Sequence, residues 1–288
     1  MTVAERTVRL ADGRDLAVAL FGDPVGRPVL YCHGFPGSRL EAALGTEAAR
    51  HRGVCLAGID RPGIGRSSPA PGRQLRDWPA DLAAVADALG YRRFSVLGVS
   101  GGGPYAAACA RALADRVSGV GIVCGLGPPE SLVDATGIGW RVRAGLATAR
   151  SFPDLVSVLF GLLAGVAARH ADRGLGVIER LLPAIDRAVL ARPEVRAAIL
   201  RSFREGLRQG GQGPARDIVL LARPWGFALD DVRVPVHLWH GELDATVPAG
   251  MGRHLARRIP GCQARFLPGE GHYSLPVGHM DEILAALA

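Results

Sequence analysis

A serine at position 100 has the sequence context of a catalytic nucleophile. It lies in Gly98-Val-Ser100-Gly-Gly102, a G-x-S-x-G spacing, with the apolar run 94–97 before it and small residues after it. Glycines two residues to either side let a strand and a helix approach closely at a strained turn. The same turn aims the backbone N–H of Gly101 at the helix N-terminus, where a developing oxyanion is favoured. The spacing therefore predicts a nucleophile elbow.

Two residues further along the chain can complete the chemistry that a serine nucleophile needs. A serine hydroxyl requires a general base, and the base requires a group that orients it. His272 lies in a loop after a short predicted strand, Asp244 lies just past another strand, and Glu242 and Glu270 are alternative acids beside them. The order Ser100, Asp244, His272 is that of one serine-hydrolase geometry. All three lie beyond strand ends, where doubly wound sheets bind ligands.

An oxyanion needs a second donor besides the Gly101 N–H. The segment His33-Gly-Phe-Pro-Gly37 follows an earlier predicted strand and offers the Phe35 backbone N–H. Gly34 permits the turn that this requires, and Pro36 fixes the path of the chain without adding a donor. Losing one such donor costs about 3–4 kcal/mol of barrier.

The elements that must position these residues alternate between strand and helix. An N-terminal hairpin turns at residues 11–14, and further strands are predicted over 28–32, 54–59, 94–99, 117–124, 234–240 and 263–267. Helices are predicted over 40–52, 75–89, 103–115 and 249–258, with a closing helix. This alternation favours an α/β fold with a mostly parallel, doubly wound sheet of about eight strands. Residues 126–230 show helical periodicity instead, and we expect them to be a helical insertion after the sixth strand.

Five motifs in this order resemble the α/β-hydrolase fold superfamily. They are His33-Gly-x-Pro-Gly37, Asp60-Arg-Pro-Gly-x-Gly-x-Ser67, Gly98-x-Ser-x-Gly-Gly103, Gly241-x-x-Asp244-x-x-Val-Pro248 and Gly271-His272. The resemblance implies a core of residues 1–125 and 231–288 with a cap at 126–230. It also implies a Ser100–His272–Asp244 triad and an oxyanion hole made by Phe35 and Gly101. Asp244 is preferred over the two glutamates because it occupies the matching position.

Differences from individual groups of α/β-hydrolase-fold enzymes limit the kinds of reaction that the resemblance implies. Epoxide hydrolases and haloalkane dehalogenases of this fold use an aspartate nucleophile, whereas a serine stands here at position 100. The insertion contains no tyrosine, which the epoxide hydrolases draw from their cap. Gly101 follows the serine where proline iminopeptidases have a tryptophan, which argues against peptidase action.

Composition limits the partners. The chain has 288 residues, 48% hydrophobic and 21% charged, and a net charge of +7. All 34 basic residues are arginines, scattered rather than clustered with aromatics, so we expect no nucleic-acid partner. The apolar run 155–168 is too short to span a membrane, and no membrane partner is expected. The N-terminus lacks an apolar secretory core, and the five cysteines are odd in number, so we expect a cytoplasmic protein with free thiols.

The resulting hypothesis is a serine hydrolase that cleaves a carboxylic ester or related acyl compound through an acyl-enzyme, with no metal or organic cofactor. The Leu, Val and Ala of the insertion indicate a small-molecule substrate with a hydrophobic group, and the run 155–164 is expected to be a packed helix. Two alternatives stay open. One is a C–C bond hydrolase or cyclase of a polyketide-like substrate with the same triad. The other is a low-turnover ligand-binding or regulatory protein. The oligomeric state also stays open.

Overall fold

One sheet of eight strands forms the centre of the computed structural model, which describes residues 4–133 and 140–287. The order across the sheet is β1-β2-β4-β3-β5-β6-β7-β8. The pairs β1–β2 and β2–β4 are antiparallel, and the other neighbouring pairs are parallel. The mostly parallel sheet is therefore confirmed. Its strands are β1 (Ala4–Arg9), β2 (Asp15–Gly22), β3 (Arg27–Cys32), β4 (Val54–Ile59), β5 (Phe94–Val99), β6 (Val117–Val123), β7 (Val236–Gly241) and β8 (Gln263–Leu267).

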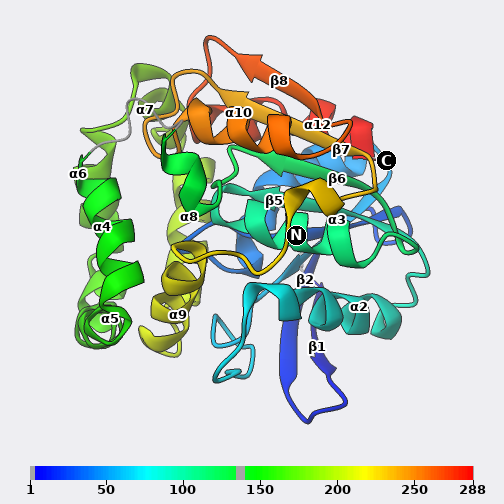
Figure 1. Ribbon diagram of the computed structural model, residues 1–288, viewed down its shortest axis with the longest axis horizontal. Coiled ribbons are helices and arrows are strands. Elements are labelled where there is room, and N and C mark those ends of the chain that lie inside the picture. The colour runs from blue at the N-terminus through cyan, green and yellow to red at the C-terminus, as the bar shows by residue number, and fades with distance from the viewer. Residues whose placement is uncertain (1–3, 134–139, 288) are drawn as a thin grey trace.

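Helices cover both faces of this sheet (Figure 1). Side chains alternate along each strand, so that Leu30 joins one hydrophobic core while its neighbours Val29 and Tyr31 join the other. The first core is closed by α2 (Trp78–Ala88), α3 (Gly103–Ala112) and α10 (Ala249–Arg258). The second is closed by α1 (Thr46–His51) and α12 (Met280–Leu287), with the short α11 (Ser274–Gly278) beside them. Burial on both faces explains why β4 and β5 read as continuous apolar runs.

Several helices are shorter than the sequence predicts. The helix expected over 40–52 is divided into a 3₁₀ segment, η1 (Arg39–Gly45), followed by α1. A Cβ at Gly45, where the helix type changes, would approach Leu56 and Met280 to 2.9 and 3.3 Å, so the chain packs closely on the core there. The other 3₁₀ segments are η2 (Leu75–Asp77), η3 (Ser100–Gly102), η4 (Pro129–Val133) and η5 (Leu229–Asp231).

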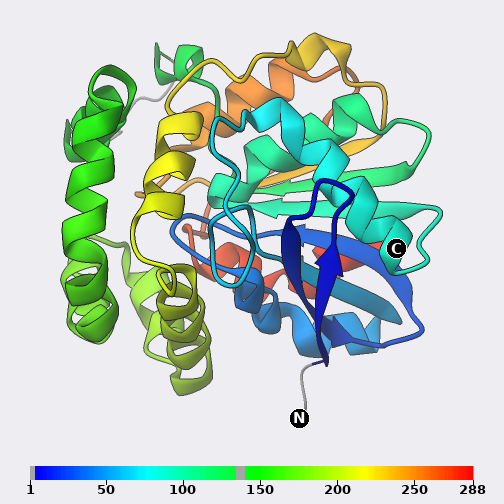
Figure 2. The same ribbon diagram turned by 90° about the horizontal axis from the view of Figure 1, so that it is seen from below.

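The segment between β6 and β7 contains only helical elements among its described residues; residues 134–139 of the predicted insertion lie outside them. Both views show these helices grouped together beside the sheet (Figures 1 and 2). They carry small hydrophobic cores of their own, one around Leu175, Leu190 and Val195 and one around Val156 and Val219. The helices are α4 (Trp140–Ser151), α5 (Pro153–Arg169), α6 (Ala171–Glu179), α7 (Ala184–Leu190), α8 (Pro193–Gly206) and α9 (Gln212–Leu221).

The helix α5 is less buried than its composition predicts. Val156 and Ala164 are buried, whereas Leu155, Leu159 and Leu162 are between 43% and 72% exposed. The prediction of a packed helix over 155–164 is therefore wrong for most of that run, because only one stripe of an apolar helix is covered. In the described part of the chain, no single helix has both the length and the apolar character to cross a membrane. The segments 143–151 and 153–169 reach that threshold only as a pair, with a 112° bend between them.

Candidate active site

Ser100 lies in a sharp turn between β5 and α3. Its φ is +54°, in the left-handed region that non-glycine residues rarely adopt, and such a residue carries about 1–3 kcal/mol of strain. The flanking glycines are required by close approach. A Cβ at Gly98 would lie 2.7 Å from Ala106 Cβ, and one at Gly102 would lie 2.0 Å from the Cys32 carbonyl oxygen. The local strand–turn–helix geometry is the one that the G-x-S-x-G spacing predicts.

His272 and Asp244 are hydrogen-bonded to each other. His272 Nδ1 lies 2.8 Å from Asp244 Oδ2, and both residues are buried. The second carboxylate oxygen, Oδ1, accepts hydrogen bonds from the backbone N–H groups of Thr246 and Val247, at 2.8 and 2.7 Å, so the turn after β7 fixes the carboxylate. A proton on Nδ1 leaves Nε2 as the acceptor, which is the tautomer that a general base needs.

Neighbouring charges shift the pKa values of both His272 and Asp244. Burial alone lowers the pKa of His272, but the carboxylates of Asp244, Asp186 and Glu41 outweigh it and raise that pKa above its ordinary value. Burial raises the pKa of the Asp244 carboxyl, but His272 and His240 outweigh it and hold that pKa well below its usual range. The pair is therefore an ionised carboxylate beside an imidazole that gains a proton readily.

The two alternative acids have other partners. Glu242 forms an ion pair with Arg253, and Glu270 Oε1 lies 3.2 Å from His279 Nε2. Among the described residues, Asp244 is the only carboxylate that is hydrogen-bonded to the His272 ring.

The loop after β3 lies against the Ser100 turn. A Cβ at Gly101 would approach the Phe35 nitrogen to 3.2 Å and Phe35 Cβ to 2.9 Å. A Cβ at Gly34 would lie 3.5 Å from Ser100 Cβ. The two backbone N–H groups expected to hold the oxyanion therefore belong to segments in direct contact, and their role stays a prediction.

Ser100 and His272 line one cavity of about 460 Å³. Helices α5, α6 and α8 of the insertion supply part of its wall, including Val166, Ile178 and Phe203. The cavity is therefore enclosed between the sheet and the insertion, and its walls are mainly apolar.

The Cys124 thiol lies beside the pair. Cys124 Sγ, a carboxylate oxygen of Asp244 and a ring nitrogen of His272 all lie within 4.8 Å of one another. Burial raises the pKa of the Cys124 thiol well above its ordinary value, and the thiolate, not the thiol, binds metals. Cys124 Sγ lies 3.7 Å from the Gly271 carbonyl oxygen, and three other cysteines, Cys32, Cys55 and Cys109, are buried as well.

A comparison with known families matches residues 27–278 to the model of the alpha/beta hydrolase fold. The chain belongs to the α/β hydrolase family. It is 26% identical over 279 residues to a non-heme haloperoxidase of Rhodococcus erythropolis, covering 92% of each chain. Among solved structures, it is similar to a thermophilic esterase from Thermogutta terrifontis, with 25% identity, a TM-score of 0.66, and coverage of 99% and 96% of the two chains. It shares the fold of a bromoperoxidase from Bacillus anthracis, with 19% identity, a TM-score of 0.70 and 99% coverage of each chain.

Sequence reasoning missed a carboxylate that this α/β hydrolase places behind the histidine loop. Asp186, on α7 of the insertion, is fully buried. Its oxygens accept hydrogen bonds from three consecutive backbone N–H groups, those of His272, Tyr273 and Ser274, at 2.9, 2.9 and 2.8 Å. A Cβ at Gly271 would lie 2.4 Å from Asp186 Oδ2, so the loop closes tightly around the carboxylate. Nothing in the sequence of a short helix distinguishes this aspartate from a solvated one.

Replacing Asp186 with asparagine should weaken both the loop and catalysis. An amide offers one acceptor oxygen where three N–H groups converge, and its NH₂ group would face a donor. We expect kcat/KM for an ester substrate to fall about tenfold to a hundredfold, the equivalent of one hydrogen bond to a charged group. Steady-state kinetics measure this. Asp172→Asn on α6, whose 60% exposed side chain pairs with Arg196, is the matched control. Unchanged activity in D186N would contradict a positioning role.

A second missed carboxylate, Asp217 on α9, joins the insertion to the core of this hydrolase. It is fully buried and pairs with Arg61 at 2.6 Å and with Arg73 at 2.5 Å, and it accepts a hydrogen bond from the Tyr105 hydroxyl at 2.8 Å. Arg61 also donates to the His33 carbonyl oxygen at 2.6 Å. The network therefore connects α9 to the loop that carries Phe35.

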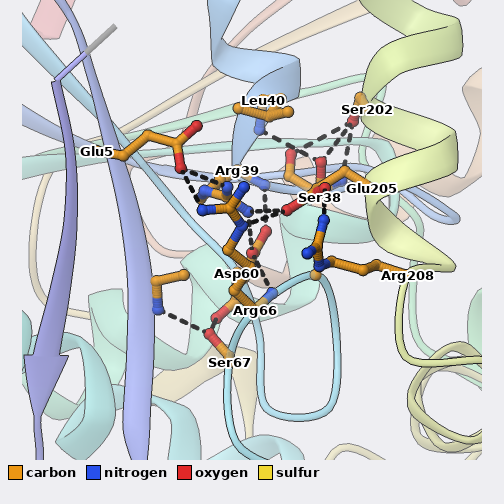
Figure 3. Close-up of polar contacts among 12 residues, drawn as sticks. Glu5, Ser38, Arg39, Leu40, Asp60, Arg66, Ser67, Ser202, Glu205 and Arg208 are labelled. Atoms are coloured by element: carbon orange, nitrogen blue, oxygen red, sulfur yellow. Dashed lines mark hydrogen bonds and ion pairs between the residues drawn. The ribbon is translucent and has the colours of Figure 1, made fainter.

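A further network, drawn in Figure 3, joins α8 to the core. The fully buried Arg39 donates to Asp60 at 2.6 Å, to Glu205 of α8 at 2.8 Å and to Glu5 of β1 at 2.9 Å. Asp60 also accepts a hydrogen bond from the Arg39 backbone N–H, at 2.6 Å. The Asp60-Arg61 motif thus supplies one partner to each of the two networks that fix the insertion.

Proposed function

We propose that this α/β hydrolase is a serine hydrolase that cleaves a carboxylic ester or related acyl compound. The observation that carries the proposal is the cavity shared by Ser100 and His272, with Asp244 bound to the far side of the imidazole. Its relatives and structural neighbours include a haloperoxidase, an esterase and an enzyme that degrades N-acyl homoserine lactones. The similarity therefore does not by itself identify the reaction that this protein catalyses.

In the proposed mechanism, Ser100 Oγ attacks the substrate carbonyl while His272 Nε2 takes its proton. Asp244 stabilises the imidazolium that forms. The backbone N–H groups of Phe35 and Gly101 hold the oxyanion of the tetrahedral intermediate. The imidazolium then returns the proton to the leaving alcohol, which departs and leaves an acyl-enzyme. Water, deprotonated by His272, attacks the acyl carbon, and Ser100 is regenerated as the carboxylic acid leaves.

In this proposal, residues 126–230 act as a cap that limits the substrate. The insertion contributes apolar walls from α5, α6 and α8, which favour a hydrophobic acyl or alcohol group. A volume of about 460 Å³ suits a small molecule rather than a polymer.

Covalent labelling tests the nucleophile. A fluorophosphonate probe should label the wild-type protein at Ser100, as located by peptide mass spectrometry, and p-nitrophenyl esters of short acids should be hydrolysed. Ser100→Ala should lose both labelling and turnover, while Ser95→Ala, at a buried serine on the same strand, should keep labelling. Absence of labelling would contradict the proposal. Labelling without ester turnover would favour the C–C hydrolase or the low-turnover binding protein, and activity on ketone substrates would separate these two.

A further inference from the structure

Glu41, on η1, lines the cavity, and one of its two carboxylate oxygens has no hydrogen-bond donor among the described residues. Its Oε1 accepts hydrogen bonds from the Gly34 backbone N–H at 2.8 Å and from the Tyr31 hydroxyl at 2.9 Å. Its Oε2 accepts none from the described residues. Glu41 also lines the cavity that contains Ser100 and His272. Glu41 is half-buried, so Oε2 can accept a hydrogen bond from a molecule that enters the cavity.

The free oxygen lies close to the proposed nucleophile. A Cβ at Gly34 would be 3.2 Å from Glu41 Oε2 and 3.5 Å from Ser100 Cβ, so both atoms border the same small volume. A Cβ at Gly37 would be only 2.7 Å from Oε2. The loop that carries Phe35 therefore packs closely against the Glu41 carboxylate at these two glycines. A substrate group two or three bonds from the scissile carbonyl would reach Oε2.

The carboxylate differs in character from the rest of the cavity. Most of the wall is apolar. Apart from Glu41 and two histidines, the charged side chain among the described residues that line it is that of Arg173, at an exposed position of α6. Burial raises the pKa of the Glu41 carboxyl, and the neighbouring hydrogen bonds and the charges of Arg61 and His272 oppose that shift. In such surroundings a hydrogen bond to the carboxylate is strong, because water competes weakly.

We propose that Glu41 is a specificity-determining residue, which selects acyl compounds with a hydrogen-bond-donating group, an ammonium or a hydroxyl, near the scissile carbonyl. The inference rests on the proposed function, because it assigns a substrate class to the same site. An anchoring role for Glu41 accounts for Oε1 and its two donors. It does not account for Oε2, which has no hydrogen-bond donor among the described residues although Glu41 lines the cavity.

Two pairs of isosteric esters test the proposal and separate its two donor groups. The first pair is p-nitrophenyl 3-(dimethylamino)propionate, protonated at neutral pH, against p-nitrophenyl 4-methylpentanoate. The second is p-nitrophenyl 3-hydroxybutyrate against p-nitrophenyl 3-methylbutyrate. In the wild type, we expect kcat/KM for at least one donor ester to exceed that of its isostere about tenfold to a hundredfold, as for one charge-assisted hydrogen bond. Preference within only one pair identifies the donor.

The variant Glu41→Gln removes the charge and keeps an oxygen for Gly34 and Tyr31. It should bring the ratio of kcat/KM between the ammonium ester and its apolar isostere close to one. The ratio carries the test, because any general effect of the substitution on the site acts on both esters of a pair. Glu47→Gln, on the following helix α1 with an 83% exposed side chain paired to Arg50, is the matched control and should change neither ratio.

Three results are possible, and the labelling of Ser100 separates them. Labelled wild type with a donor preference that E41Q removes supports the inference. Labelled wild type with ratios near one in both pairs, or with a donor preference that E41Q retains, overturns it and leaves the proposed function intact. If wild-type Ser100 is not labelled, the proposed function fails, and the specificity assigned to Glu41 is overturned with it.

Discussion

Replacing Asp244 with asparagine (D244N) will lower kcat for a p-nitrophenyl ester about ten-thousandfold. In the proposed mechanism, the Asp244 carboxylate, 2.8 Å from His272 Nδ1, holds a proton on that nitrogen and so leaves Nε2 free to act as the base. An asparagine is held in place by the N–H groups of Thr246 and Val247, which bind the other oxygen, so its NH₂ group points at Nδ1. That group donates to Nδ1, moves the ring proton to Nε2, and blocks proton transfer from Ser100.

We expect D244N also to change the dependence of kcat/KM on pH. Catalysis needs neutral His272, whose pKa is raised above its ordinary value in the wild type, so kcat/KM falls as the pH drops through that raised pKa. In D244N the main charge that opposes the effect of burial is gone, so the acid limb of the residual activity moves to lower pH. Steady-state rates between pH 4 and 9 measure both effects. Glu242→Gln, two residues away and paired with Arg253, should change neither. A loss of less than about tenfold in D244N would rule out Asp244 as the orienting acid.

Asp217→Asn should have the largest effect on stability. The carboxylate neutralises Arg61 and Arg73, which are both buried, and removing one member of a buried charge cluster costs about 3–5 kcal/mol of unfolding free energy. Urea unfolding of the wild type and D217N measures the difference. Asp87→Asn, which removes a 65% exposed carboxylate paired with Arg116, should cost about 1 kcal/mol or less. Equal losses in the two variants would contradict the role given to the buried network.

The dependence of this difference on pH follows from the direction of the Asp217 shift. Burial raises its pKa, but the charges of Arg61 and Arg73 outweigh burial, and the pKa in the folded state lies below the unfolded value of 3.8. The stabilisation is therefore fully present above pH 3.8 and is lost as the pH falls toward the folded-state pKa. The wild type should thus approach D217N in stability only in acid, whereas at pH 7 the difference should be complete.

The parts of the molecule that the sequence predicts are those whose geometry is local. The turn at Ser100 follows from two glycines within two residues of it, and the His272 loop and the Asp244 turn each follow directly after a strand. Alternation of strand and helix then predicts that these strand ends share one edge of a parallel sheet. The boundaries are predicted less accurately, since the helix expected over 40–52 is divided into η1 and α1 at Gly45, where the chain packs closely against Leu56 and Met280.

The residues that sequence reasoning missed act over long distances along the chain. Asp217 meets Arg61 across 156 residues, and Asp186 meets His272 across 86. On their own helices, both look like solvated acids, because local periodicity says nothing about which surface a helix will bury. Glu41 is close to the His33–Gly37 loop in sequence, but its free oxygen is significant only once the cavity is closed by helices of the insertion.

The hydrogen bonds of Asp186 fix α7 of the insertion to the loop that carries His272. Within the described chain, α7 supplies the only acceptor found for three amides of the histidine loop. A movement of α7 away from the core would therefore also displace the loop that carries His272. Access for substrate must therefore be found with α7 in place. On the other side of the cavity, His170, Arg173 and Val177 of the α5–α6 region are exposed and line it at the same time. In the proposed mechanism, substrate would therefore reach Ser100 from the side of α5 and α6 while α7 stays in place.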